Sequence, residues 1–245
     1  MTAILSTDQL TKKFGALTAV DSVSIDIEKG EFLSIIGPNG AGKTTFFNVL
    51  SGRMKPTDGT ITFREEHITE LPPYELVDRG IARSFQITNV FSELTLRENV
   101  MAAVQGRADV GRFEAIEGLT DIRNRSDELL RRVGITEDPE VKAEELSYGM
   151  QRRLEIAIIL GLEPELVLLD EPAAGLNKQE TNELMDLISD IGTDRTIVLI
   201  EHDMNVVMKM SDRIVVLHNG AVLENDRPPT VQESEDVQRV YMGGV

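Results

Sequence analysis

At 245 residues, of which 41% are hydrophobic, the chain can bury a sizeable core, yet no apolar run approaches the roughly 20 residues that cross a bilayer. Forty-two acidic residues against 25 basic ones give a formal net charge of −17, which argues against nucleic acid as the main partner because phosphate backbones require Lys and Arg surfaces. The absence of cysteine excludes disulfides and thiolate metal sites and is consistent with a soluble, cytoplasmic protein.

The first part of the chain predicts strands followed by one short helix. Residues 23–27 alternate between apolar and polar side chains, which is typical of a half-exposed strand. Residues 31–37 (EFLSIIG) end in a continuous apolar run, as in a strand buried on both faces. Directly after them come residues 37–45 (GPNGAGKTT) and an apolar helix pattern that Gly52 closes.

From about residue 92 to 163 strand signals vanish and helical patterns dominate, and we interpret this segment as a helical lobe inserted into an α/β core. Beyond it, residues 166–170 (LVLLD) and 196–201 (TIVLIE) predict two more buried strands, with a helix of one apolar face over 178–191. A strand, helix, strand unit of this kind builds parallel sheets. Near the C-terminus, Asn219-Gly220 lies between two apolar runs and predicts a two-residue hairpin turn.

Residues 37–44 satisfy the P-loop pattern Gly-x-x-x-x-Gly-Lys-Thr in its required context, after a buried strand and before a helix. Its glycines let backbone N–H groups turn inward around phosphate oxygens, and the helix N-terminus adds positive potential. We expect Lys43 to reach the outer phosphates as a catalytic group and the Thr44 hydroxyl to ligate Mg²⁺. The residues expected to contact nucleotide in this loop are Gly37, Pro38, Asn39, Gly40, Ala41, Gly42, Lys43, Thr44 and Thr45.

The resulting fold class is α/β: a P-loop NTPase core with a mainly parallel sheet, an antiparallel β subdomain and the inserted helical lobe. No internal repeat or linker of low complexity interrupts the sequence. We therefore expect residues 1–245 to form a single nucleotide-binding domain.

Polar positions follow two buried strands, at the edge where α/β folds bind their ligands. Asp170 is predicted to hold a water on the P-loop magnesium, and Glu171 to orient and deprotonate the attacking water. His202 would hydrogen-bond the γ-phosphate or that water. A structural role at the sheet edge is the alternative for all three residues.

Two further side chains complete the predicted site. Gln86 follows a short strand pattern and would contact Mg²⁺ and the γ-phosphate as part of the catalytic machinery, with a plain surface amide as the alternative. Phe14 is assigned to a polar loop between two strand patterns. There it would stack on an adenine or simply pack against its neighbours.

A second Ser/Gly turn, in residues 145–155 (ELSYGMQRRLE), opens another helix about a hundred residues after the P-loop. Ser147 occupies an N-cap position, and its hydroxyl, Gly149 and the free N–H groups make a second anion site. One ATP does not need two helix N-termini of one chain on the same phosphate. We therefore predict that Ser147 and Gly149 serve a nucleotide bound by a partner subunit.

Two other classes of P-loop protein fit less well. A small-molecule kinase has no use for a second anion-binding turn. A GTPase would need a base-reading Asn-Lys-x-Asp, and residues 177–180 (NKQE) carry Glu at the last place and do not follow a strand.

The order and rough spacing of the motifs resemble those of the ATP-binding subunits of ABC transporters. The motifs that carry this resemblance are Phe14, 37–45, Gln86, 146–151 (LSYGMQ), 166–172 (LVLLDEP), 175–177 (GLN) and His202. The resemblance covers essentially the whole chain. It implies hydrolysis of ATP with Mg²⁺ by two subunits that face head to tail. Lys43, Thr44, Gln86, Asp170, Glu171 and His202 would then serve the chain's own ATP, while Ser147 and Gly149 reach the partner's.

The chain departs from the usual family signature, Leu-Ser-Gly-Gly-Gln. Tyr148 replaces the first glycine, and Met150 stands where the glutamine would be. Asn177 likewise stands where many relatives carry aspartate. These changes bear on efficiency and partner choice rather than on ATP binding.

Longer stretches resemble the subunits that energise import of branched-chain amino acids; they are 146–157, 170–177, 199–208, 211–220 and the tail 237–244 (VQRVYMGG). Urea and short-chain amide importers share much of this pattern, and a soluble ABC ATPase outside transport is a further alternative. The resemblance implies a peripheral subunit at the cytoplasmic face of the membrane. Its partners would be a second ATPase subunit, identical or closely related, transmembrane permease subunits and, indirectly, an external substrate-binding protein. A groove formed by the helical lobe and the segment after Gln86 would receive a cytoplasmic helix of the permease.

Overall fold

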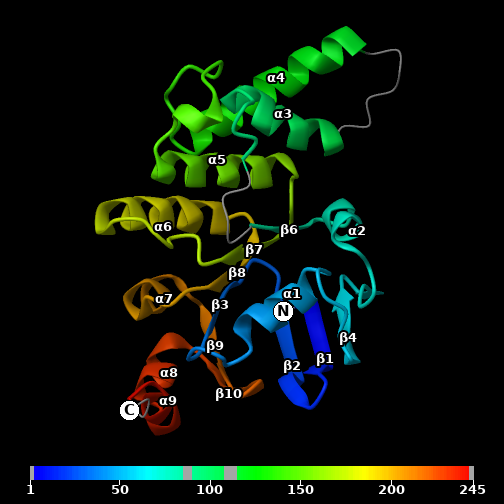
Figure 1. Cartoon of the computed structure of the whole chain (residues 1–245), viewed down its shortest axis with the longest axis vertical. Helices are drawn as coiled ribbons and strands as arrows, with labels where there is room; N and C mark the ends of the chain where they lie inside the picture. Colours follow the sequence, from blue (N-terminus) through cyan, green and yellow to red (C-terminus); the bar gives the residue numbers. More distant parts are fainter. Residues whose placement is uncertain (1–2, 85–89, 108–114, 243–245) are drawn as a thin grey trace.

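The computed structural model describes residues 3–84, 90–107 and 115–242, and two sheets organise them (Figure 1). An antiparallel sheet has the order β2-β1-β4-β5, with β1 (Ala3–Phe14), β2 (Leu17–Glu28), β4 (Asp58–Phe63) and β5 (Glu66–His67). The second sheet has the order β10-β9-β3-β8-β7-β6, with β3 (Phe32–Ile36), β6 (Ile81–Arg83), β7 (Leu166–Asp170), β8 (Thr196–Ile200), β9 (Arg213–His218) and β10 (Ala221–Asp226). All of its pairs are parallel except β9 with β10. The predicted fold class is confirmed.

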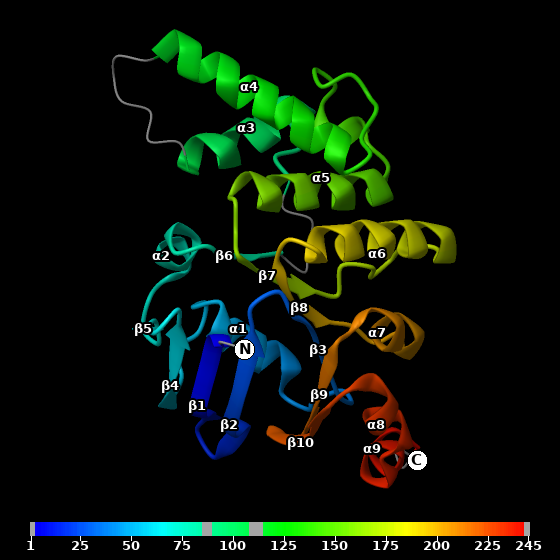
Figure 2. The same ribbon diagram turned by 180° about the vertical axis from the view of Figure 1, so that it is seen from behind.

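The helices gather on the second sheet and beyond it. They are α1 (Lys43–Leu50), α2 (Pro73–Asp78), α3 (Leu96–Arg107), α4 (Ala115–Arg132), α5 (Tyr148–Gly161), α6 (Lys178–Gly192), α7 (Met204–Met210), α8 (Pro228–Glu233) and α9 (Glu235–Met242), with a 3₁₀ turn at Ala143–Glu145. Both views place α3, α4 and α5 together beyond α6, at the opposite end from the antiparallel strands (Figures 1 and 2). That residues 92–163 act as a distinct lobe stays a prediction. Among the helices in the described ranges, none has the length and apolarity that a bilayer crossing demands.

The strands of the parallel sheet are buried on both faces, as their continuous apolar runs predicted. In β7, Leu166 and Leu168 join a core shared with α1 and the antiparallel sheet. Val167 and Leu169 point into a second core with α5 and α6. Helix α1 therefore lies between the two sheets, and apolar side chains of both sheets pack with its Phe46 and Phe47.

Three strands that neighbour one another in the sheet deliver their following loops to one edge. β3 pairs with β8, and β8 pairs with β7, all in parallel. The register sets Ile35 of β3 and Asp170 of β7 on either side of Ile200 in β8. The carboxyl ends of the three strands therefore lead into one crevice, the usual place for a ligand in this fold class.

The predicted hairpin turn is confirmed, and it touches the P-loop. Asn219 and Gly220 both have positive φ, 51° and 83°, as a two-residue turn between twisted strands requires. The Gly220 N–H donates to the Ala41 carbonyl at 3.0 Å, and the Gly220 carbonyl accepts from the Asp21 N–H at 2.8 Å. The turn thus connects the P-loop to β2.

We expect Gly220→Ala to destabilise the protein by about 2 kcal/mol, because a positive φ costs an alanine about 1 kcal/mol and the added methyl meets rigid backbone. A Cβ at this position would lie 3.0 Å from the Ala19 carbonyl oxygen. Gly30→Ala is the matched control, since Gly30 has a φ of 80° and no neighbour within 4 Å of its Cβ position. Urea denaturation of both variants gives the difference, and equal losses would show that the contact with Ala19 does not matter.

Candidate functional site

Two glycines of the P-loop are required by space as well as by backbone conformation. Gly37 has a φ of 152°, and a Cβ there would lie 2.2 Å from the Leu217 carbonyl oxygen. Gly42 has a φ of 101°, and a Cβ there would lie 2.3 Å from the Ala19 carbonyl oxygen. The loop is therefore pressed against the β9–β10 hairpin on one side and β2 on the other.

The start of α1 offers both charge and free donors to an anion. Gly42 provides no side-chain cap, and the first turn contains no acidic residue, so the amide groups there keep their positive potential. The Lys43 ammonium lies inside the loop and donates to the Gly37 and Pro38 carbonyls at 2.6 and 3.1 Å. Burial lowers the pKa of Lys43, while the charges of Glu171 and Asp170 raise it. Thr44 is exposed and Thr45 half-buried.

Asp170 is buried at the end of β7 and is held by residues of β6 and the position after it. Its Oδ2 accepts from Arg83 Nη2 at 2.8 Å, and its backbone N–H donates to Ser84 Oγ at 3.1 Å. Oδ1 is buried and has no hydrogen-bond partner in the described part of the chain. Burial raises the pKa of Asp170, and the ion pair with Arg83 opposes that shift. One acceptor oxygen is thus left for a further group.

These residues fit Mg²⁺ only together with a phosphate. Over the residues that the structure describes, no three His, Cys, Asp or Glu side chains come together as a metal cluster would require. Mg²⁺ is usually held by one or two protein oxygens, substrate phosphates and water. The exposed Thr44 hydroxyl and the unpartnered Oδ1 of Asp170 are donors of that kind.

Glu171 and His202 are in contact, although they follow different strands. His202 Nε2 lies 2.7 Å from Glu171 Oε1, and Glu171 has a φ of 49°, which turns its half-buried side chain away from the strand direction. Glu201 joins the two loops, because its carboxylate accepts from the backbone N–H groups of Ala173 at 3.3 Å and His202 at 2.9 Å. Sequence reasoning assigned no role to Glu201, although it directly follows a buried strand, as Glu171 does.

The second Ser/Gly turn lies apart from the P-loop. Ser147 is the N-cap of α5, as predicted, and its Oγ accepts from the Met150 N–H at 3.4 Å. Helix α5 lies beyond α6 from α1 in both views (Figures 1 and 2). The structure therefore brings Lys43, Asp170, Glu171 and their neighbours together and leaves Ser147 outside that group.

The residues that depart from the usual signature have local partners. The Tyr148 hydroxyl donates to the Ala174 carbonyl at 3.3 Å and accepts from Arg152 Nη2 at 2.7 Å. Its ring fills the space beside Gly175, where a Cβ would lie 3.2 Å from it. Tyr148 is thus directed at the loop between β7 and α6.

Two neighbouring amides order the same region. Gln151, next to Met150, donates from its side chain to the Ala143 and Leu146 carbonyls, both at 3.3 Å. Asn177 caps α6 by accepting from the Gln179 and Glu180 N–H groups at 2.9 and 3.0 Å. Since Asn and Asp are equally good caps, this change preserves the start of the helix.

Of the two remaining predicted site residues, the structure describes Phe14 but not Gln86. The assignment of Phe14 to a loop is wrong, because the residue ends β1 and pairs with Leu17 across a two-residue turn. Strand pairing extends further than the polar composition of this stretch suggested. The ring is 46% exposed with the Lys12 ammonium 5.4 Å from its centroid, so stacking on a base stays a prediction. Gln86 lies outside the described residues.

The C-terminal tail reaches the P-loop, although sequence reasoning found no catalytic use for it. Burial raises the pKa of Tyr241 to about 12, and a hydrogen bond with the Gly37 backbone opposes that shift. The contact joins α9 to the first glycine of the loop. No local pattern in the sequence signals it.

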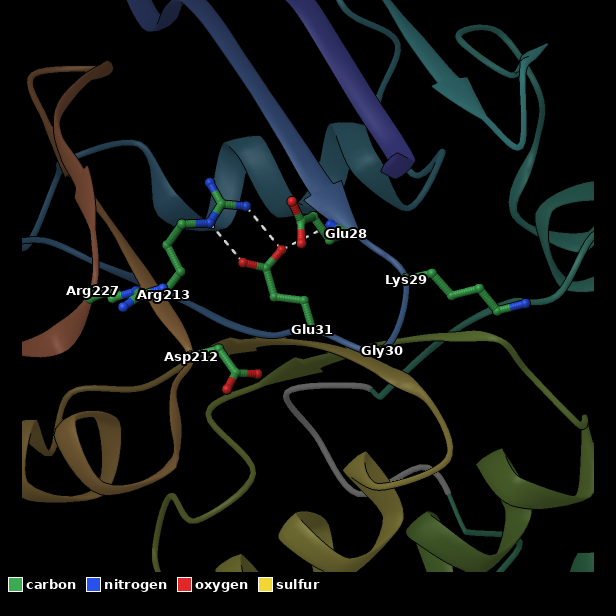
Figure 3. Close-up of a pocket in the computed structure, with 7 residues that line it drawn as sticks. All are labelled: Glu28, Lys29, Gly30, Glu31, Asp212, Arg213 and Arg227. Carbon is green, nitrogen blue, oxygen red and sulfur yellow. Dashed lines mark hydrogen bonds and ion pairs between the residues drawn. The ribbon is translucent and has the colours of Figure 1, made fainter. Parts of the chain in front are cut away.

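A charged cavity of about 430 Å³ lies at the other end of the sheet, where β3 and β9 begin (Figure 3). Arg213 donates to both carboxylate oxygens of Glu31, at 2.7 and 2.9 Å, and Lys29 pairs with Glu165 at 3.6 Å. Because ligands of parallel α/β sheets bind at the carboxyl ends of the strands, we do not assign this cavity to the nucleotide.

The sequence as a whole matches known proteins. A family model described as "ABC transporter" matches residues 20–174. The chain is 43% identical over 249 residues to the high-affinity branched-chain amino acid transport ATP-binding protein LivG of Salmonella typhimurium, and the match covers 98% of each chain.

Solved structures give the same result. An ATP-binding cassette of an ABC transporter in its ADP conformation superposes with a TM-score of 0.87 at 28% identity, covering 99% of this chain and 100% of that one. A dimeric post-hydrolysis state of another ATP-binding cassette, bound to ADP and Pi, gives 0.79 at 29% identity, covering 91% of this chain and 98% of that one.

Proposed function

The chain belongs to the ABC transporter family, and from that premise we propose that it is the ATP-hydrolysing subunit of an importer of branched-chain amino acids. The observation that carries the ATPase part is the convergence of Lys43, Asp170 and the Glu171–His202 pair at one edge of the sheet. The cargo rests on the name of the 43% identical relative. ATP binding and hydrolysis would drive uptake through a permease.

The P-loop binds the phosphates of ATP through the backbone of Gly37, Gly40 and Gly42 and the first turn of α1. Lys43 would exchange two neutral carbonyl acceptors for charged phosphate oxygens, which form stronger hydrogen bonds with an ammonium. Phe14, exposed at the end of β1, would stack on the base. The adjoining residues of the proposed contact set are Pro38, Asn39, Ala41, Thr44 and Thr45.

Mg²⁺ would be held by the Thr44 hydroxyl, by a water on Asp170 and by Gln86, and it would neutralise charge on the phosphate oxygens. Glu171 would act as the general base that accepts the proton of the attacking water. Two features restrict the orientation of the Glu171 carboxylate. They are the positive φ of its backbone, 49°, and the contact between His202 Nε2 and Glu171 Oε1 at 2.7 Å. General base catalysis of this kind depends on position first and on the pKa second.

A second ATPase subunit would complete each site. Ser147 is exposed, and Tyr148 is directed at Ala174, which leaves the Tyr148 and Gly149 N–H groups to face a nucleotide on a partner, whereas the Met150 N–H donates to Ser147 Oγ. Gly149 allows the Glu180 side chain to approach the turn closely, since a Cβ there would lie 3.1 Å from Glu180 Oε1. The partner is either a second copy or a closely related chain.

A cytoplasmic helix of the permease would lie in the groove formed by the helical lobe and the segment after Gln86, and Leu162 of that lobe lies beside the end of α1. An apolar cavity of about 120 Å³ is lined there by residues that include Ser51, Leu76, Ile81, Arg83 and Leu162. Tyr74, at the start of α2, is 68% exposed nearby in sequence. We place the subunit at the cytoplasmic face of the membrane, with the external substrate-binding protein acting only through the permease.

The cargo can be tested in cells of the source organism from which this gene has been deleted. Reintroducing the gene is expected to restore uptake of labelled leucine, while the Glu171→Gln form fails to do so. Restoration of urea uptake instead would identify the urea and amide importer alternative. If neither uptake depends on the gene, and no polytopic membrane protein co-purifies with the subunit, a soluble role would replace transport.

We expect Glu171→Gln to lower ATP turnover by about 100- to 10,000-fold, because the amide cannot accept the proton of the attacking water. Binding of a fluorescent ATP analogue should persist. Glu163→Gln is the matched control, since Glu163 shares the positive φ, 47° against 49°, and lies outside the site. Near-normal hydrolysis by Glu171→Gln would remove Glu171 from this role.

Ser147→Arg is expected to lower hydrolysis by roughly 100-fold, since a bulky side chain at the turn displaces the partner's phosphates. ATP binding by its own P-loop should be unchanged. Ser234→Arg is the control, because Ser234 Oγ also accepts a helix N–H, from Val237 at 3.5 Å, on a different part of the surface. Intact hydrolysis in the Ser147 variant would contradict a site shared between subunits.

A further inference from the structure

Arg83, the last residue of β6, is a buried guanidinium with acceptors on two different elements. Its Nη2 donates to Asp170 Oδ2 at 2.8 Å, and the two side chains are only 7% and 0% exposed. Its Nη1 donates to Asn48 Oδ1 at 2.7 Å and to Ser51 Oγ at 2.6 Å. The guanidinium also lies over the Phe47 ring, 5.0 Å from its centroid. Arg83 therefore connects β7 to the C-terminal end of α1.

These contacts distinguish the two oxygens of Asp170. Oδ2 is occupied by Arg83, while Oδ1 is buried without a partner among the described residues. The Asp170 backbone is fixed as well, because its N–H donates to Ser84 Oγ at 3.1 Å. A carboxylate held in this way has one orientation, and it presents only Oδ1 to a further group.

The same contacts set the position of that oxygen relative to the P-loop. Thr44 lies in the first turn of α1, whereas Asn48 and Ser51 lie at its other end. The C-terminus of a helix carries partial negative charge, which a guanidinium there complements. Because α1 is a single enclosed helix of eight residues, fixing its end to Asp170 also fixes Thr44 relative to Asp170.

We propose that Arg83 is a positioning residue for the metal half of the nucleotide site. Its ion pair with Asp170 leaves one carboxylate oxygen for a magnesium-bound water, and its bonds to Asn48 and Ser51 hold that oxygen in register with Thr44. The inference rests on the proposed function, since it concerns the Mg²⁺ that accompanies ATP. Arg83 itself contacts neither nucleotide nor metal.

The test is equilibrium binding of a fluorescent ATP analogue to the full chain, with Mg²⁺ titrated from an EDTA-treated start. In Arg83→Met, the Mg²⁺ concentration for half-maximal effect is expected to rise about tenfold, as is usual when a partner of a metal-holding group is lost. Analogue affinity in EDTA should stay within about twofold of the wild type, because the P-loop contacts are separate. Arg83→Lys should recover part of the loss, since it retains the charge.

Arg64→Met is the matched control. Arg64 also pairs with a carboxylate, Glu165, and lies over a phenylalanine ring, 5.1 Å from the Phe63 centroid, but it is outside the site. It should leave the Mg²⁺ dependence unchanged. If Arg83 acts through Asp170, the double variant Arg83→Met with Asp170→Asn should match Asp170→Asn alone.

An unchanged Mg²⁺ requirement in Arg83→Met overturns the inference, and so does an equal loss of affinity with and without Mg²⁺, which would indicate a purely structural role. If Arg83→Met does not fold, Asn48→Ala and Ser51→Ala answer the question, because each removes one anchor of Arg83 and should raise the Mg²⁺ requirement by a smaller factor. A wild-type chain that binds no nucleotide would refute the proposed function instead, so the two failures are distinguishable.

Discussion

The enclosure of α1 between two sheets is the constraint on which the rest of the site depends. Phe46, Phe47, Val49 and Leu50 of this helix are all buried, so its first turn cannot shift without opening the larger apolar core. The P-loop inherits this rigidity, because Gly37 and Gly42 leave no room even for a methyl group beside the flanking backbone. The ammonium group of Lys43 is buried in the same region. Burial lowers the pKa of Lys43, and the negative charges of Glu171 and Asp170 oppose that shift. A charge held in such surroundings gains most when phosphate oxygens become its partners.

Around this fixed helix, neighbouring strands supply the polar groups in matched positions. Asp170 ends β7 and Glu171 follows it, while Glu201 and His202 follow β8, and the parallel register brings both pairs to one edge. Backbone donors then join the two loops through Glu201. Glu171 and His202 are therefore brought together by sheet pairing and need no long loop to meet.

Much of this arrangement is readable from the sequence, because its signals are local. The continuous apolar strands, the P-loop between a strand and a helix, the Ser147 cap and the Asn219-Gly220 turn each occupy a few consecutive residues. Phe14 was misplaced because polar composition hides the pairing of β1 with β2. Arg83 was missed for a different reason: its partners Asn48, Ser51 and Asp170 lie 35, 32 and 87 residues away, and only the tertiary fold brings them together. The contact of Tyr241 with Gly37 is equally nonlocal.

The loop between β7 and α6 carries Glu171 and also contacts the turn that opens α5. It begins at Glu171, it accepts a hydrogen bond from Tyr148 through Ala174, and it ends at the α6 cap, where Glu180 lies against Gly149. The turn that opens α5, proposed to bind a partner's nucleotide, thus contacts the same short loop that begins at Glu171. In a head-to-tail pair, a displacement of this turn by the partner's nucleotide would reach Glu171 through contacts within one subunit, without passing back across the interface.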